Sequence, residues 1–268
     1  MKINTEIVKE SARYVSDYFS KNLDPKFTYH NLSHTIYVVK AAEMLCEAMK
    51  VNNHHKKILL VAAWFHDLGY TQQIDSHETA GAFIAEKFLS EKNVDKEDID
   101  LVKCCILSTH YPQKPATRLE EILCDADMMH LSDKAFIDAA ALLRKEWEFV
   151  KGKKYTDEEW YNLNVQFVSA HQYHTSYGIK NLESHKNKNV KRLSSNLEEV
   201  TNKQNNLNGM ELLPDKQKKK NKERLERGVE TLFRTASSTS GVVTRRPFTN
   251  RLSIPRSARN CVICFPPP

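Results

Sequence analysis

The stretch from residue 58 to residue 70, Ile-Leu-Leu-Val-Ala-Ala-Trp-Phe-His-Asp-Leu-Gly-Tyr, constrains the fold more than any other part of the chain. Its uninterrupted apolar run predicts a buried helix, and we expect Gly69 to end that helix. His66 and Asp67 then lie at the end of a buried element, where an imidazole and a carboxylate are costly unless something compensates them. A divalent metal ion is one compensation, because both groups are ordinary metal ligands. The alternative is a hydrogen-bonded pair that caps the helix.

The composition is that of a soluble globular protein. The chain has 268 residues, of which 40% are hydrophobic and 28% charged, and this length predicts one large domain or one domain with an appendage. The longest apolar run, residues 58–65, is too short to cross a bilayer, and the first residues lack the apolar stretch of a signal peptide. The six cysteines show no disulfide-framework spacing. We therefore expect a cytoplasmic protein with reduced thiols.

Helical periodicity dominates the first two thirds of the chain, and no strand or hairpin signal stands out. Thr156 and Glu159 form a capping-box pattern at the start of one of the expected helices. The predicted fold class is all-α, a helical bundle over residues 1–178. The expected helices cover residues 4–23, 33–49, 58–67, 77–91, 95–110, 118–131, 133–150 and 156–178.

The remaining third has a different composition. Residues 179–214 are rich in Asn, Lys, Ser and Glu and are predicted to be a linker or a weak helix. Residues 215–236 regain helical propensity, whereas residues 237–268 have no periodicity and are expected to be disordered. Cys261 and Cys264 form a lone C-x-x-C, which is weak evidence for zinc without a second pair.

Charge is distributed unevenly along the chain. The net charge is +6, but acidic residues are in excess before residue 180 and basic residues after it. A basic extension can meet nucleic acid or an anionic membrane surface. A solvated linker is the commoner explanation, so we expect no stable nucleic-acid partner.

Six polar residues of the bundle could converge, because all but one lie at or near an expected helix end. Taken singly, each histidine is more often a surface or hydrogen-bonded residue. Bundle cores are nevertheless a usual place for metal and ligand sites, and the ordered set is harder to dismiss. The six are His34, His66, Asp67, His77, His110 and Asp127.

Part of this set resembles the H…HD…D signature of the HD-domain superfamily of metal-dependent phosphohydrolases. The resemblance covers residues 1 to about 175. It is carried by three motifs: Tyr29-His30-Asn31-x-x-His34-Thr35, His66-Asp67-Leu68-Gly69-Tyr70 and Asp125-Ala126-Asp127.

The resemblance implies a centre of one or two divalent ions. The first ion would be held by His34, His66, Asp67 and Asp127, with Asp125 supporting the ligands. In the dinuclear subgroup two further histidines lie between the HD pair and the last aspartate, and Asp67 bridges both ions. His77 and His110 occupy suitable positions, so we favour two ions. Nitrogen and oxygen ligands without thiolate admit Fe, Mn, Co or Zn.

Such a centre would hydrolyse a phosphomonoester or phosphodiester with a metal-activated water. Asp67, His77 and His110 are the candidate catalytic residues, and the substrate would be a nucleotide or a related phosphorylated small molecule. Leu68-Gly69-Tyr70-Thr71 lacks the acidic residues expected of a ppGpp hydrolase, and the motif of cyclic-di-GMP phosphodiesterases is missing. The candidate substrate-binding residues are His30, Tyr70, Lys114 and Arg118, with Lys103 as a further cation.

Two other functions remain open. Some HD relatives with additional histidines are di-iron oxygenases. The third possibility is a nucleotide-sensing domain of a membrane-linked anti-phage effector, without turnover. Residues 222–236 resemble the lead-in to the two-helix membrane module of Pycsar-type effectors, which would tether full-length relatives to the inner membrane. No apolar span follows residue 237, so we expect residues 237–268 to be out of frame and the module lost. The sequence does not predict an oligomeric state.

Overall fold

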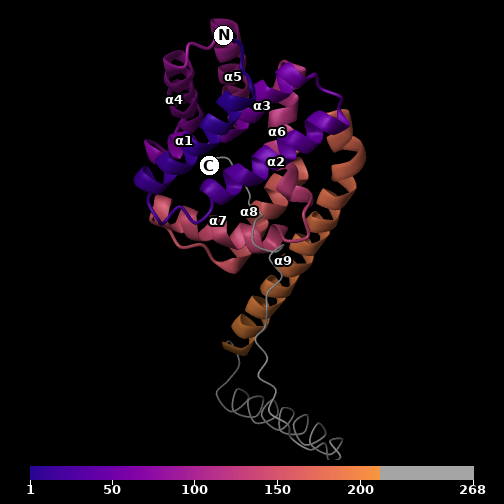
Figure 1. The fold of residues 1–268 in the computed structure, drawn as a ribbon. Coiled ribbons are helices and arrows are strands. Elements are labelled where there is room, and N and C mark those ends of the chain that lie inside the picture. Colours follow the sequence, from indigo (N-terminus) through magenta and orange to yellow (C-terminus); the bar gives the residue numbers. More distant parts are fainter. Residues whose placement is uncertain (212–268) are drawn as a thin grey trace, which may run out of the picture. The chain divides into compact units, whose positions relative to one another are not determined.

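The computed structural model describes residues 1–211, with side chains described to residue 206, and this range contains helices and no strand (Figure 1). The all-α prediction is confirmed. The predicted helix over residues 215–236, the tail over residues 237–268 and the Cys261–Cys264 pair lie outside the described residues. The α-helices are α1 (Thr5–Asn22), α2 (Leu32–Ala48), α3 (Asn53–Phe65), α4 (His77–Glu91), α5 (Lys96–Ser108), α6 (Arg118–Asp127), α7 (Phe136–Lys151), α8 (Asp157–Ala170) and α9 (Glu183–Glu211).

Helix α3 is the centre of the bundle, packing against α1, α2, α4, α5 and α6. It begins at Asn53, five residues before the apolar run, because Asn52 caps it by accepting a hydrogen bond from the His55 backbone N–H at 2.9 Å. Burying each large apolar side chain of this run contributes about 1.5–3 kcal/mol. The fully buried members are Ile58, Leu59, Val61, Ala62, Ala63 and Phe65.

Side-chain caps fix the starts of several other helices. Asn31 accepts a hydrogen bond from the Ser33 N–H at 2.9 Å, which starts α2 and places His34 on its first turn. The capping box predicted at α8 is present, because Thr156 and Glu159 each accept a hydrogen bond from the other's backbone N–H.

Two glycines let α4 approach the end of α3 backbone to backbone. A Cβ on Gly69, in the short 3-10 helix η1 (Leu68–Thr71), would lie 1.9 Å from the His77 carbonyl oxygen. A Cβ on Gly81 would lie 2.7 Å from the Phe65 carbonyl oxygen. The sequence suggested that Gly69 ends the helix, but α3 ends at Phe65 and Gly69 lies inside η1 with a φ that is not positive. Its role is the close approach, which brings the first residue of α4 next to Asp67.

The chain after α8 differs from the sequence-based outline. Helix α8 ends at Ala170 rather than near residue 178, and a short π-helix, η3 (Gly178–Leu182), leads directly into α9 where a linker or weak helix was expected. Leu182, Lys186, Asn189 and Leu193 are all buried, and their spacing of four, three and four residues places them on one face of a helix. Two of these four buried residues are polar, so the sequence of this segment shows little hydrophobic periodicity.

The segment from residue 171 to residue 193 holds the turn that follows α6. This turn is the 3-10 helix η2 (Met128–Ser132). Asn189 Nδ2 donates to the carbonyl oxygens of Leu131 and Asp133, both at 2.8 Å, and Tyr173 Oη donates to that of Met128 at 3.1 Å. The compact unit accordingly reaches Ser195, and a second unit begins at Asn196.

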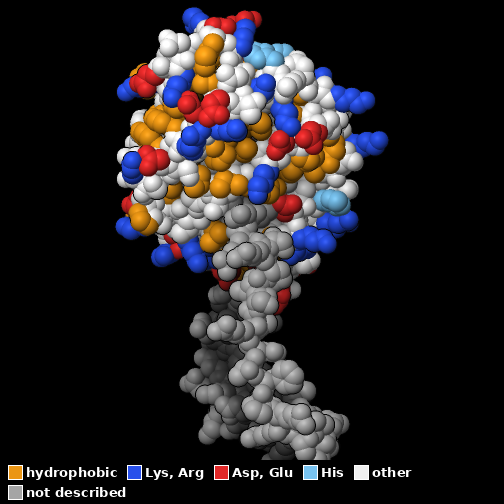
Figure 2. All heavy atoms as spheres, viewed as in Figure 1, with side chains coloured by type: hydrophobic (Ala, Val, Ile, Leu, Met, Phe, Trp, Pro, Cys, Tyr) orange, Lys and Arg blue, Asp and Glu red, His pale blue; other side chains and the backbone are white. Residues whose placement is uncertain are grey.

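The surface of the body is mixed in charge. Figure 2 shows Lys and Arg side chains interspersed with Asp, Glu and apolar side chains on the face it presents. Within residues 1–211, the helices lack the combination of length and apolar character needed to span a membrane.

Candidate metal centre

Three helix ends bring four of the predicted ligands together. His34 lies on the first turn of α2, His66 and Asp67 directly follow α3, and Asp127 is the last residue of α6. The sequence placed Asp127 inside a longer helix, but α6 gives way to η2 at this residue. These four residues, called the inner cluster, have side chains no more than 4% exposed.

His34, His66 and Asp127 offer ligand atoms within 4.8 Å of one another, close enough to share one ion, and Asp67 contacts both histidines. His34 Nε2 lies 3.1 Å from Asp67 Oδ2, 3.3 Å from Asp127 Oδ1 and 3.3 Å from His66 Nε2. His66 Nε2 lies 3.3 Å from Asp67 Oδ2 and 3.7 Å from Asp127 Oδ1. Donors that share an ion at about 2.1 Å are themselves about 3.0–3.4 Å apart in octahedral or tetrahedral sites.

Hydrogen bonding at the inner cluster also fits a cation. His66 Nδ1 contacts the Ala63 carbonyl oxygen at 2.9 Å and must donate to it, so the neutral ring directs the lone pair of Nε2 at the cluster. Asp67 Oδ2 is buried and has no hydrogen-bond partner in the described structure. His34 differs from the usual pattern because its Nδ1 is buried without a partner as well. Lone pairs facing one another are repulsive unless a proton or a metal ion lies between them.

The electrostatics point the same way. Burial alone would lower the pKa of His66, but Asp67 and Asp127 raise it well above its usual range. Burial alone would raise the pKa of Asp67, but His66, His34 and His77 lower it well below its usual range. The pKa of Asp127 is likewise lowered, because His34 and His66 outweigh its burial. The two carboxylates therefore stay ionised at neutral pH and attract positive charge.

A second group of side chains extends the inner cluster toward solvent. His77 Nδ1 contacts the Ile74 carbonyl oxygen at 3.1 Å, which leaves Nε2 3.5 Å from Asp67 Oδ1 and 3.4 Å from Glu78 Oε1. Glu78 Oε1 also lies 3.2 Å from His110 Nδ1. His77, Glu78 and His110 are called the outer cluster. Asp67 contacts both clusters, one through each carboxylate oxygen.

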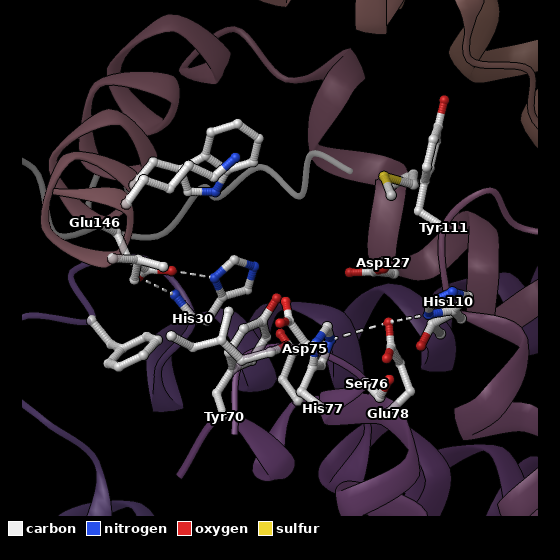
Figure 3. Close-up of a pocket in the computed structure, with 18 residues that line it drawn as sticks. His30, Tyr70, Asp75, Ser76, His77, Glu78, His110, Tyr111, Asp127 and Glu146 are labelled. Carbon is white, nitrogen blue, oxygen red and sulfur yellow. Dashed lines mark hydrogen bonds and ion pairs between the residues drawn. The ribbon is translucent and has the colours of Figure 1, made fainter. Parts of the chain in front are cut away.

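Both clusters open onto a cavity of about 580 Å³. Figure 3 shows Asp127, Glu78 and His110 on one side of it and His30 with Glu146 on the other. Tyr70 stacks between two imidazoles, with its ring centroid 3.8 Å from that of His77 and 4.2 Å from that of His30. Both faces of the Tyr70 ring are thus covered by the protein.

Helix α7 forms the wall opposite the metal ligands. Glu146 is buried, accepts hydrogen bonds from the backbone N–H groups of Tyr29 and His30 at 2.8 and 3.0 Å, and pairs with His30 Nδ1. Lys151 lies on the same helix with Nζ 3.8 Å from the centroid of the Trp147 ring. Both Trp147 and Lys151 line the cavity.

A comparison with protein families agrees with this geometry. Residues 31–131 match the family model of the HD domain. Residues 31–131 form an HD domain. The match includes all six predicted metal ligands, and HD domains are generally metal-dependent hydrolases. No curated protein and no solved structure matches the chain. The resemblance of residues 222–236 to a Pycsar-type module is not addressed by these comparisons and stays a prediction.

Three predicted residues lie away from the cavity of the HD domain. Lys103 Nζ pairs with Glu86 Oε2 at 2.6 Å, and Arg118 donates to the Met49 carbonyl oxygen beside a different, smaller cavity. Lys114 is exposed and does not line the main cavity. Arg118 lies away from the main cavity because it is the first residue of α6, whereas Asp127 is the last.

Asp125 faces away from the ligands it was expected to support. Its carboxylate accepts hydrogen bonds from the His174 and Thr175 backbone N–H groups at 2.8 and 2.9 Å and from the Thr175 hydroxyl at 2.6 Å. Residues that lie two positions apart on a helix point roughly in opposite directions, so Asp125 and Asp127 cannot face the same site. Asp125 anchors the chain that follows α8.

Sequence reasoning overlooked Glu78, Glu146 and Lys151. Glu78 directly follows His77, and a carboxylate beside a predicted ligand on the first turn of a helix was an available signal. Glu146 and Lys151 gave no signal, because both lie in a charge-rich helix where a solvated position is the usual outcome. Their place at the cavity depends on how α7 packs across it.

Proposed function

We propose that the HD domain hydrolyses a phosphate ester of a small molecule, with divalent ions held by the inner and outer clusters. The observation that carries this proposal is the convergence of His34, His66 and Asp127, whose ligand atoms lie within 4.8 Å of one another, with Asp67 Oδ2 3.1 and 3.3 Å from the two histidines. When bound, divalent ions in such a site lower the pKa of a coordinated water and neutralise charge on phosphoryl oxygens.

Each cluster has a distinct part in the proposed reaction. In the inner cluster, His34, His66, Asp67 and Asp127 would hold a first ion. In the outer cluster, His77 and His110 would hold a second one, and Asp67 has one carboxylate oxygen beside each cluster. Glu78, buried between the two imidazoles, is placed to accept the proton released by the attacking water.

The rest of the cavity binds and orients the ester. His30 is fixed by Glu146 and by stacking on Tyr70, so its ring has one orientation. Tyr70 acts through His77 and His30 rather than by stacking on substrate, since both its faces are covered. A nucleotide substrate and a cytoplasmic location belong to this proposal as expectations from the sequence.

Metal analysis combined with a phosphatase panel tests the proposal. The full chain, stripped with chelator and reloaded with Mn²⁺ or Co²⁺, should release phosphate from phosphomonoesters or phosphodiesters. Asp67→Asn should reduce kcat/KM by about 10³-fold or more, because it removes a charge shared by both clusters. Asp138→Asn, an exposed aspartate on α7, is the matched control and should keep full activity.

Two results would contradict the proposal. The first is turnover that survives in Asp67→Asn or in the chelated protein. The second is oxygen consumption by the Fe(II)-loaded protein without phosphate release, which would assign the site to the oxygenase alternative.

A further inference from the structure

The cavity has a second polar end that metal binding does not use. Its metal side is formed by Asp67, Asp127 and the outer cluster, and α7 faces it from across the cavity, as the position of Glu146 opposite Asp127 and His110 makes clear (Figure 3). Phe27, Ile74, Trp147 and Val150 make most of this far side apolar. Lys151 is the exception.

Lys151 is the only Lys or Arg among the described residues that line the cavity. Its Nζ is buried and has no hydrogen-bond acceptor within the described structure. A buried ammonium without an acceptor is costly. The contact with the Trp147 ring repays part of this cost but leaves the three N–H donors unused.

The charge of Lys151 depends on its burial and on its charged neighbours. Burial lowers the pKa of Lys151, Asp75 opposes this effect, and Lys153 adds to it. Asp75 is exposed, lines the same cavity and is not a hydrogen-bond acceptor for Lys151 Nζ. Its carboxylate attracts the Lys151 ammonium from a distance and therefore competes with an incoming anion.

We propose that the ammonium group of Lys151 binds a second anionic group of the ligand, at the end remote from the metal ligands. The site would then take small molecules with two anionic ends: a phosphate at the metal side, and a phosphate or carboxylate at Lys151, joined by a flat or apolar middle. This inference rests on the proposed function for its first anion and names the substrate class of the same site.

Binding of non-hydrolysable ligands tests this inference separately from catalysis. Calorimetric titration of the Mn²⁺-loaded full chain would use alkylphosphonates and phosphonoalkanoates of matched length, over a series of chain lengths. The wild type should bind the carboxylate-bearing member about tenfold more tightly than its matched alkylphosphonate at the length that spans the cavity. Hydrolysis of phosphate esters is measured in a separate assay.

Variants at Lys151 decide the source of that preference. Lys151→Met should reduce the ratio of the two affinities to about one and leave alkylphosphonate binding within about twofold of wild type. Lys151→Arg should keep most of the preference, because it keeps the charge. Lys145→Met, which removes an exposed lysine from the same helix, should keep all of it.

Asp75→Asn provides a test that leaves Lys151 intact. Removing this competing carboxylate should increase the preference about threefold. Equal affinities across the wild-type series, a preference that survives in Lys151→Met, no gain in Asp75→Asn, or no phosphonate binding at all would each overturn the inference. Carboxylate preference without any ester hydrolysis would uphold it and overturn the proposed function instead.

Discussion

The inner and outer clusters differ most in how far the fold fixes them. The side chains of the inner cluster are 0–4% exposed and come from the ends of α2, α3 and α6, whereas the His110 side chain is 60% exposed and contacts Glu78. Burial restricts the inner side chains to one arrangement. The position of the outer cluster depends on two local contacts, that of Gly69 with the His77 backbone and the stacking of Tyr70 on the His77 ring. We therefore expect the first ion to bind to a preformed site and the second to a more adaptable one.

The largest effect should come from comparing one histidine of each cluster. His66→Ala should remove all bound metal and reduce kcat/KM by about 10³-fold or more, because it deletes a ligand of the first ion and the contact that holds Asp67, which faces both clusters. His110→Ala should keep one ion per chain and reduce kcat/KM by about 10²-fold. Metal content after dialysis and phosphate-release kinetics measure both. Loss of all metal in His110→Ala would show that the clusters are a single unit.

Gly69→Ala tests the close backbone contact that places His77 next to Asp67. The added methyl group would meet the His77 carbonyl oxygen at 1.9 Å, so α4 must move, at a cost of roughly 3 kcal/mol in the free energy of unfolding. Gly152→Ala is the matched control: Gly152 has a φ of 62° but nothing within 4 Å of an added Cβ, and its cost should be about 1 kcal/mol. Denaturant unfolding measures both. Equal costs would mean that the close approach is not a constraint.

The pH dependence of the metal-free protein should report on the inner cluster. The pKa of His66 is raised in the folded state, so its contribution is complete below about pH 6.5 and is lost as pH rises through the raised pKa. The pKa of Asp67 is lowered, so its contribution is present above about pH 4 and is lost only in strong acid. Chelated protein should therefore lose stability as the pH rises from 6 to 9.

Metal should abolish that alkaline loss, because the imidazoles then bind the ion rather than a proton. Thermal unfolding with chelator and with Mn²⁺ at each pH makes the comparison. His66→Leu should show a smaller loss than wild type in chelator. A chelated wild-type protein whose stability is constant from pH 6 to pH 9 would contradict this account of the inner cluster.

The smallest expected effect comes from substitutions of Tyr70. Its ring stacks on His77 at 3.8 Å, a contact of about 1 kcal/mol, so Tyr70→Leu should weaken the second ion about fivefold and spare the first. Tyr70→Phe keeps the stack and should bind both ions as the wild type does. Titration of the chelated protein with Mn²⁺ resolves the two affinities. If Tyr70→Phe were as weak as Tyr70→Leu, the hydroxyl rather than the stack would matter.

The sequence predicted those parts of the fold that local rules determine. The apolar run before His66 and the capping pattern at Thr156 are readable because burial and capping leave a local trace. The start of α3 at Asn53 was missed because its first turn is polar, and α9 was underestimated because Lys186 and Asn189 occupy its buried face. These outcomes depend on neighbours that are distant in sequence.

The same distinction applies to the site. The histidines and aspartates of the metal centre were selected by residue type and order, and the structure brings them together, although their roles stay predictions. The cations expected to bind substrate, Lys114 and Arg118, were selected only for their proximity in sequence to His110. The lysine that does line the cavity, Lys151, lies more than twenty residues beyond Asp127, at the end of α7. The position of a residue in the sequence does not indicate which helix will pack across the cavity.

The bonds from Asn189 and Tyr173 to the turn after Asp127 set a practical limit on how short a working fragment can be. That turn belongs to the family match, yet its carbonyl oxygens are satisfied by side chains some forty to sixty residues downstream. A fragment that ends at residue 131 or at residue 178 would lack these side chains. The carbonyl oxygens of the turn would then lose their hydrogen bonds, and the Asp127 carboxylate that precedes the turn would lose its fixed position. The smallest autonomous fragment is therefore longer than the matched domain, and extends to about residue 195.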